Sequence, residues 1–177
     1  MKRMFILLTI ALFAFGCGKK EAKENFQGVT SKTGYVKEGQ KYLQQGEVVN
    51  AIKSFDKAIQ QEPTNAANYL ILGQLYMRLK SYDKAADTFS AAARIAPDSG
   101  EVFYLLAFSE ALGGKREYAI KAAQQSAVLF QKKNEIEKMN KALVLWKSLS
   151  DANQPPAAVA ADVPAGAVVV PDAGMDK

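Results

Sequence analysis

The side chains that most often carry enzymatic and metal chemistry are scarce in this sequence of 177 residues. It contains no histidine and a single cysteine, Cys17. A chain without histidine has no imidazole general base, no Ser-His or Cys-His nucleophile and no imidazole ligand for zinc or haem. One cysteine cannot form an internal disulfide or a cysteine-rich metal cluster. We therefore expect no cofactor and no metal site.

Carboxylate catalysis, which needs two acids converging in one cleft, is the remaining alternative. The acidic pairs closest in sequence are Asp83 with Asp87 and Glu135 with Glu137. The first pair lies at an expected helix start, where acids favour the helix dipole, and the second pair does not share a helix face. Glycine-rich phosphate loops and Gly-x-Ser-x-Gly motifs are also missing. The sequence therefore predicts a protein that is not an enzyme.

The surroundings of Cys17 indicate modification rather than catalysis. A positively charged start, residues 1–3, is followed by the uncharged and almost wholly apolar residues 4–15. This run is shorter than the roughly 20 residues of a membrane-spanning helix and is typical of a secretory signal peptide. Its end, Ala-Phe-Gly-Cys at residues 14–17, resembles the lipobox of bacterial lipoproteins, although Ala14 and Phe15 depart from the usual Leu and small residue.

The lipobox resemblance implies that residues 1–16 are a lipoprotein signal peptide that is cleaved off. It also implies that Cys17 is acylated and that residues 17–31 form a flexible tether to the membrane. Two or three acyl chains anchor a protein stably, whereas one is marginal. Gly18 after the cysteine permits export to the outer membrane in an organism with two membranes, with the protein facing the periplasm. The alternative is an ordinary signal peptide or an uncleaved anchor in which Cys17 is incidental.

A repeat with one fixed offset runs through the middle of the chain. Seven residues recur in register, namely Tyr35, Gly39, Tyr42, Ala51, Phe55, Ala58 and Pro63, which return as Tyr69, Gly73, Tyr76, Ala85, Phe89, Ala92 and Pro97. A third copy is degenerate. Apolar residues recur at helical spacing on either side of a short turn, so each copy is predicted to form two helices. Small residues such as Gly73 and Ala85 let those helices approach closely.

These positions resemble the tetratricopeptide repeat (TPR) family. Its full pattern occurs in residues 66–99, nearly all of it in residues 32–65, where Glu38 replaces the usual Leu, and part of it in residues 100–133. The resemblance implies an all-α fold, a TPR superhelix of three helix-turn-helix repeats plus a C-terminal capping helix at residues 134–150. We expect the capping helix to pack through an apolar stripe, Ile136, Met139, Leu143, Trp146 and Leu149. Trp146 is expected to pack against the third repeat, and the alternative is that it is a surface anchor for a partner.

The predicted TPR domain, residues 32–150, is followed by an Ala-, Pro- and Val-rich segment, residues 151–177, which we predict to be a disordered tail. Within that tail, Val168–Pro171 could dock in a groove of this chain or of a partner. Residues 33–150 carry 16 Lys and Arg against 12 Asp and Glu, without a basic stripe. We therefore expect no nucleic-acid partner.

In the TPR family, the first helix of each pair lines a concave face that binds extended peptides or partner helices. Family offsets place Glu101 on this face together with eight residues that form the predicted groove, Val36, Gln40, Leu43, Leu70, Gln74, Met77, Tyr104 and Phe108. Family members that grip the C-terminal carboxylates of chaperones use Lys, Asn and Arg at positions that here hold Val36, Gln40, Ile71, Glu101 and Leu105. Apolar and acidic side chains cannot pair with a carboxylate.

The sequence therefore predicts a membrane-anchored scaffold of the bacterial cell envelope that binds an apolar or amphipathic segment of a protein or peptide partner. In plan it is similar to the small TPR lipoproteins that serve pilus, secretion or outer-membrane assembly. The alternative is an envelope protein that binds a small molecule or cell-wall fragment in the same groove, with Tyr104 and Tyr69 or Tyr76 stacking on a sugar. Self-association through the third repeat and the capping helix also stays open.

Overall fold

The computed structural model describes residues 34–151, which form seven helices and no strand. The bounds are α1 (Gly34–Gln44), α2 (Val48–Gln61), α3 (Ala66–Arg78), α4 (Tyr82–Ile95), α5 (Gly100–Leu112), α6 (Arg116–Lys132) and α7 (Ile136–Ser150). The predicted signal peptide, Cys17 and the predicted tail after residue 151 lie outside the described residues. Within residues 34–151, no helix is long and apolar enough to cross a membrane. The prediction of an all-α fold is confirmed.

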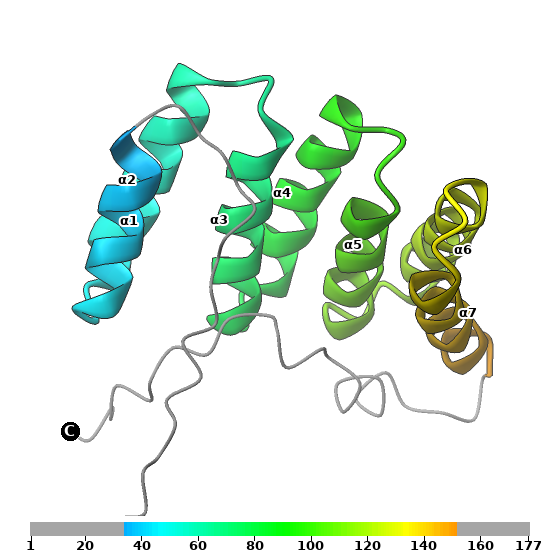
Figure 1. Ribbon diagram of the computed structural model, residues 1–177. Coiled ribbons are helices and arrows are strands. Elements are labelled where there is room, and N and C mark those ends of the chain that lie inside the picture. The colour runs from blue at the N-terminus through cyan, green and yellow to red at the C-terminus, as the bar shows by residue number, and fades with distance from the viewer. Residues whose placement is uncertain (1–33, 152–177) are drawn as a thin grey trace, which may run out of the picture.

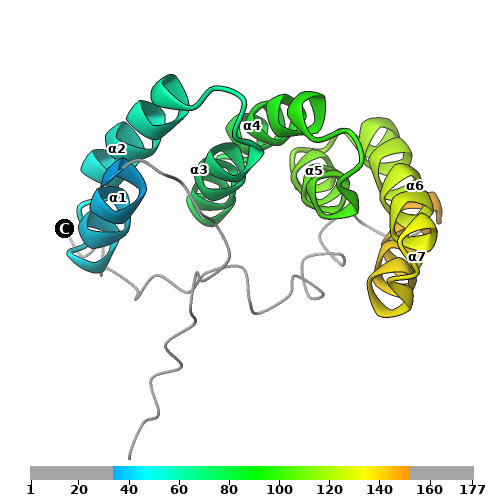
Figure 2. The same cartoon turned by 45° about the horizontal axis from the view of Figure 1, so that its top comes forward.

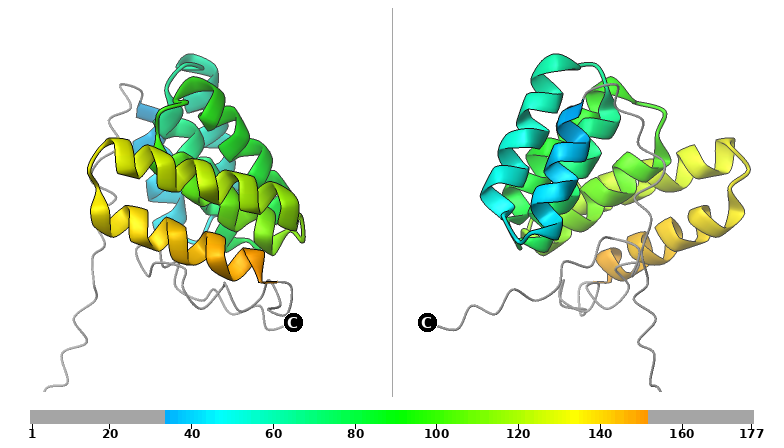
Figure 3. Two further views of the ribbon diagram at one scale, coloured as in Figure 1. Left: turned by 90° about the vertical axis from the view of Figure 1, so that its right-hand side faces the viewer. Right: turned by 60° about the vertical axis from the view of Figure 1, so that its left-hand side comes forward.

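The helices follow one another along an arc in chain order, with α1 at one end and α7 at the other (Figure 1). Turned forward, the arc shows α2 and α4 on its outer side and α1, α3 and α5 on its inner side (Figure 2). The last two helices, α6 and α7, run antiparallel to each other at the C-terminal end (Figure 3). The fold thus consists of three helical pairs, α1–α2, α3–α4 and α5–α6, with α7 added to the last.

A glycine facing a phenylalanine ring joins the two helices in each of the first two pairs. A Cβ atom placed on Gly39 would lie 2.5 Å from the Phe55 ring, and one on Gly73 would lie 2.5 Å from the Phe89 ring. Both rings are buried, with 1% and 0% of their surface exposed. The sequence repeat therefore encodes a close helix contact that only a residue without a side chain allows.

The third pair forms the same contact at a different place. One repeat after Gly73 and Phe89 stand Ala107 and Ala123, both fully buried. The close contact of a glycine with a phenylalanine recurs instead between Gly100 and Phe130, where an added Cβ would lie 2.8 Å from the ring. Gly100 is the first residue of α5, and Phe130 lies in the last turn of α6, which has 17 residues against 14 in α2 and α4. The contact has moved two helical turns, to the open end of the pair.

One kind of tight turn closes all three pairs and also joins α6 to α7. Each turn contains one residue with a positive φ angle, namely Gly46, Lys80, Gly114 and Asn134. The next N–H then donates to a carbonyl five residues earlier, as from Glu135 to Phe130 over 3.0 Å. This pattern is a Schellman closure of the preceding helix. The capping helix α7 is therefore joined to α6 by the same kind of turn that joins the two helices of each pair.

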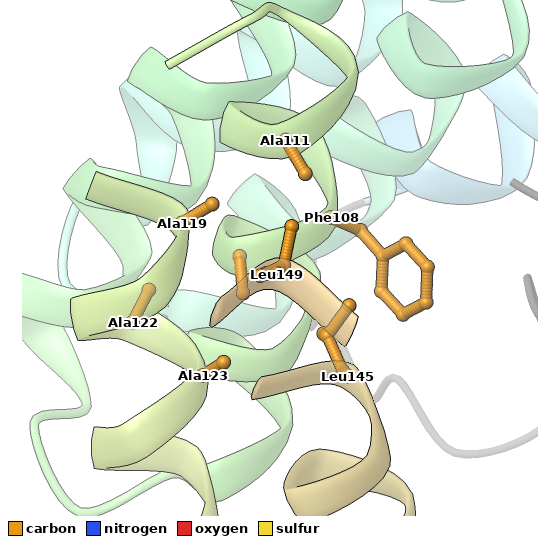
Figure 4. Close-up of a cluster of buried hydrophobic side chains, with 8 residues drawn as sticks. Phe108, Ala111, Ala119, Ala122, Ala123, Leu145 and Leu149 are labelled. Carbon is orange, nitrogen blue, oxygen red and sulfur yellow. The ribbon is translucent and has the colours of Figure 1, made fainter. Parts of the chain in front are cut away.

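The buried face of α7 differs from the predicted stripe. Ala142, Leu145 and Leu149 are buried, whereas Ile136 is 50% exposed and Leu143 is 36% exposed. The reason is visible where α5, α6 and α7 meet, because α6 presents a row of alanines that leaves room for the two leucines of α7 (Figure 4). Packing against this row fixes the rotation of α7. The prediction was wrong for Ile136 and Leu143, and it missed Ala142 and Leu145.

Candidate functional site

Two of the eight residues of the predicted groove are buried. Val36 is 4% exposed and belongs to the core formed by α1, α2 and α3, and Phe108 is 2% exposed and belongs to the core formed by α5, α6 and α7. Figure 4 shows Phe108 beside Leu145, which comes from α7. Family offsets alone could not foresee this burial, because it depends on how the neighbouring helices pack. Val36 and Phe108 therefore offer no contact surface in this structure.

The other six residues of the predicted groove are half-buried and form what we call the inner surface: Gln40 and Leu43 of α1, Leu70, Gln74 and Met77 of α3, and Tyr104 of α5. Leu70, Gln74 and Met77 are spaced by four and three residues, so they lie on one face of α3. The three helices that carry these residues are those on the inner side of the arc (Figure 2).

The part of the inner surface nearer the C-terminus is apolar. Met77, Tyr104 and Trp146 all pack, half-buried, against the core that contains Phe108, and Met139 joins Tyr104 against the neighbouring core around Phe130. Met139 and Trp146 thus extend the inner surface beyond the six predicted residues, and we call Met77, Tyr104, Met139 and Trp146 its apolar half. It is contributed by three helices, α3, α5 and α7.

Tyr104 is the central residue of this apolar half. Its ring meets that of Phe108 edge to face, with ring centroids 4.9 Å apart and an interplanar angle of 75°. This geometry is favourable for aromatic pairs and fixes the orientation of the tyrosine. The expectation that Trp146 packs against the third pair is confirmed. Sequence reasoning did not add Met139 and Trp146 to the groove, because they come from the capping helix, which has no place in the family offsets.

Two tyrosines of the alternative sugar site, Tyr76 and Tyr104, pack against different cores. Tyr76 packs against the core of α1, α2 and α3, whereas Tyr104 packs against the cores formed by α5, α6 and α7. Lys84 lies 5.7 Å from the ring centroid of Tyr76, and the Tyr69 hydroxyl donates to the Pro63 carbonyl over 3.0 Å. Burial, together with the charge of Asp56, raises the pKa of Tyr76. These tyrosines are engaged in packing the repeats.

Glu110 of α5 joins the acidic pair Asp83 and Asp87 of α4 at the junction of the second and third pairs. Lys115 forms ion pairs with Asp83, at an N–O distance of 2.9 Å, and with Glu110, at 3.9 Å. Burial raises the pKa of Glu110, the charge of Lys115 lowers it, and the charges of Asp87 and Asp83 raise it further. Among the described residues, no group of three or more acids could hold a metal ion. The sequence alone did not reveal Glu110, since α4 and α5 meet only in the folded chain.

Comparisons with known proteins identify a family match for part of the chain and structures of similar fold. Residues 42–107 match the family described as tetratricopeptide repeat. No curated protein matches the chain in sequence. Among the solved structures that are similar in fold, two each cover 66% of this chain. The TPR2B domain of yeast Sti1 in complex with pHsp70 has a TM-score of 0.58 and 17% identity, over 93% of its own length. The first TPR domain of Spaghetti (RPAP3), bound to the HSP90 peptide SRMEEVD, has a TM-score of 0.51 and 24% identity, over 97% of its length.

Proposed function

We propose that this chain is a non-enzymatic scaffold that binds an apolar or amphipathic peptide segment of a protein partner on its inner surface. Residues 42–107 match the tetratricopeptide repeat family, and the fold is similar to that of a solved TPR domain. The observation that carries this proposal is the apolar half, in which Met77, Tyr104, Met139 and Trp146 present partly exposed side chains from three helices. Aromatic and methionine side chains in such a position are typical anchors for peptides. The amide of Gln74, on the same helix as Met77, is available to bond a peptide backbone.

The ligand proposed here differs from those in the two similar structures. Those structures are complexes with pHsp70 and with the HSP90 peptide SRMEEVD, which contains acidic residues. In this chain, the positions that the TPR resemblance assigns to carboxylate binding include the buried Val36 and Ile71 and the exposed acid Glu101. An acidic C-terminal peptide would find no cation at these positions. The apolar half instead favours a segment with apolar side chains.

We also propose that the scaffold acts in the bacterial cell envelope, anchored to a membrane by lipid on Cys17 and facing the periplasm. The support is the sequence pattern of residues 1–17. Assembly of a pilus, a secretion system or an outer-membrane complex fits this plan. The test is metabolic labelling with an alkyne fatty acid. The full-length chain should be labelled and sediment with membranes, and Cys17→Ser should not be labelled. A labelled Cys17→Ser chain would refute acylation at Cys17.

The scaffold proposal is tested by photo-crosslinking in intact cells. The full-length chain would carry a photo-reactive residue at position 74, on the inner surface, and in a second variant at position 84, an exposed site on α4. We expect protein partners to be captured from position 74 and not from position 84. Capture of the same proteins from both positions, or of none, would refute binding on the inner surface.

Tyr104→Ala sharpens this test, with Tyr118→Ala as the matched control. Tyr118 lies on α6 and is 65% exposed, so it offers the same side chain outside the inner surface. Removing an aromatic anchor typically costs about 2 kcal/mol of binding energy, or roughly thirtyfold in affinity. We expect capture from position 74 to fall by about this factor in Tyr104→Ala only, with unchanged helical content by circular dichroism. Equal capture by both variants would exclude Tyr104 as an anchor.

A further inference from the structure

The described chain ends beside the apolar half of the inner surface. The last helix, α7, supplies Met139 and Trp146 to that half and ends at Ser150. The next residue, Asp151, is fixed at its backbone, because the side chain of Arg116 on α6 donates a hydrogen bond to its carbonyl oxygen. The residues that follow therefore start from a fixed point on the helical pair that borders the apolar half.

Residues 168–171 are within reach of this surface. The segment that joins Asp151 to Val168 spans about 23 Å on average as a flexible coil and up to about 55 Å when extended. Packed helices lie about 10 Å apart, so the distance from α7 across α5 to α3 is roughly 20 Å. The whole apolar half, including Met77 on α3, lies within that range.

Residues 168–171 also match the surface in chemistry. Val168, Val169 and Val170 are the longest run of large apolar side chains after residue 151, and Pro171 follows them. Valine and proline favour the extended backbone in which peptides lie along a groove. Residues 151–177 carry four Asp and one Lys, and residues 33–150 carry a net charge of +4. Opposite net charges favour their encounter.

We propose that Val168–Pro171 of this same chain occupies the apolar half of the inner surface and competes there with the partner. This inference uses the surface of the proposed function but does not require that a partner exists. A linked segment acts at an effective concentration of about 1 mM. If its own dissociation constant is about 0.1 mM, it weakens the binding of a partner roughly tenfold. The segment then sets a threshold, so that only a partner of higher affinity displaces it.

The experiment uses the full-length chain with the photo-reactive residue at position 74, digested with trypsin after irradiation. Residues 148–177 contain no Lys or Arg before Lys177, so they form a single tryptic peptide. We expect this peptide to be crosslinked to the one that contains position 74. The variant Val169→Asp, which places a charge in the apolar run, should lose at least four-fifths of the crosslink. The matched control Val163→Asp, with the same change before the run, should keep it.

Mixing unlabelled chains with ¹⁵N-labelled chains identifies the source of the crosslinked peptide. We expect light peptides to join only light peptides and heavy only heavy, as an intrachain contact requires. Crosslinks that mix the two labels would overturn the proposal, because the occupant would then be a second copy. No crosslink, or an equal crosslink in Val169→Asp, would overturn it as well. In either case the capture of a partner from position 74 is a separate result, so the two proposals can fail independently.

Discussion

In both the second and the third helical pair, a glycine on one helix contacts a phenylalanine ring on the other, but the contact lies at different positions along the helices. In α3–α4, Gly73 meets Phe89 near the middle of both helices. In α5–α6, the middle positions are Ala107 and Ala123, and Gly100 meets Phe130 at the open end. Phe130 also contributes to a core with Ala142 of α7. The shift therefore lets one ring stabilise both the third pair and the capping helix.

The third pair keeps the contact between glycine and phenylalanine but forms it outside the repeat pattern. Helix packing therefore requires the contact, whereas its position in the repeat can change. Two helices need one point of close approach, and a ring that fills the space beside it. Where a further helix must be held, the point moves toward that helix. The third copy departs from the repeat pattern because Phe130 packs both within the third pair and against the capping helix.

Among the changes that test the comparison of the two pairs, Phe130→Ala is expected to lower the unfolding free energy most. Phe130 is 5% exposed, and removing a buried ring costs about 3–5 kcal/mol of unfolding free energy. Phe89→Ala should cost a similar amount. Urea denaturation followed by circular dichroism measures both. The control is Val128→Ala, on the same helix and 44% exposed, which should cost less than about 0.5 kcal/mol. If Phe130→Ala is as mild as the control, the shifted contact does not stabilise the third pair.

The next effect concerns the glycine side of the two contacts. Gly73→Ala should destabilise the fold by about 1–3 kcal/mol, because its Cβ would lie 2.5 Å from the buried Phe89 ring. Gly100→Ala should cost less, since the corresponding distance is 2.8 Å at a helix end. Gly34→Ala is the control, because nothing lies within 4 Å of its added Cβ. Thermal unfolding ranks the three, and a larger loss for Gly34→Ala would contradict the packing argument.

A smaller change in unfolding free energy is expected for Asn68→Val. Asn68 of the second pair occupies the repeat position that Val102 occupies in the third pair. The Asn68 amide donates to the Ala58 carbonyl over 3.1 Å, but that carbonyl also accepts from the Glu62 N–H over 3.0 Å. Asn68→Val would remove one hydrogen bond and also the cost of burying an amide, so the unfolding free energy should change by less than about 1 kcal/mol. Urea denaturation measures the change. A loss well above that of one ordinary hydrogen bond would mean that Asn68 makes the second pair depend on a polar contact that the third pair lacks.

The smallest effect is expected at the junction of the two pairs, for Glu110→Gln. The pKa of Glu110 is raised in the folded state, so the folded protein binds a proton more tightly than the unfolded chain does. The ionised carboxylate therefore costs stability above its folded pKa, and stability is regained as the pH falls toward the ordinary glutamate pKa. Glu110→Gln should stabilise the fold by a few tenths of a kcal/mol at pH 7, since the group is partly solvated.

Urea titrations of the wild-type chain and of Glu110→Gln at pH 7 and pH 4 measure this effect. The gain from Glu110→Gln should disappear at the lower pH, where the wild-type carboxyl is protonated. A gain that stays constant with pH would show that ionisation of Glu110 is not its cause. The exposed acid Glu117 of α6 provides the control, because Glu117→Gln should change stability by less than about 0.5 kcal/mol at pH 7.

The sequence allowed the helical pairs to be predicted, because a repeat at a fixed offset and helical spacing are local signals. It did not reveal the shifted contact, since Gly100 and Phe130 have no counterparts in the first two copies. It also did not reveal the burial of Phe108 or the rotation of α7. Both depend on the row of alanines on α6, and the sequence does not say which helix packs against that row. The shifted contact, the burial of Phe108 and the rotation of α7 are all set by which helices pack against each other in the folded chain.

The candidate site was predictable to a similar degree. Family offsets assigned Leu70, Gln74 and Met77 to the groove, and all three lie half-buried on one face of α3, while their role in binding stays a prediction. The family offsets did not include Met139 and Trp146, and Trp146 was considered as a partner anchor only as an alternative, because their contribution depends on the place of α7 beside α5. A signal was nevertheless present, since Met139 and Trp146 lie two helical turns apart, on one side of their helix.

The linear order of the helices has a mechanical consequence. The described chain enters at α1 and leaves after α7, at opposite ends of the arc (Figure 1). A pulling force applied between these ends would pass through every helix interface in series. Among the interfaces between consecutive helices, that between α2 and α3 is the smallest. The α1–α2 pair would therefore detach first under tension, while α3 to α7, with the apolar half of the inner surface, would stay folded.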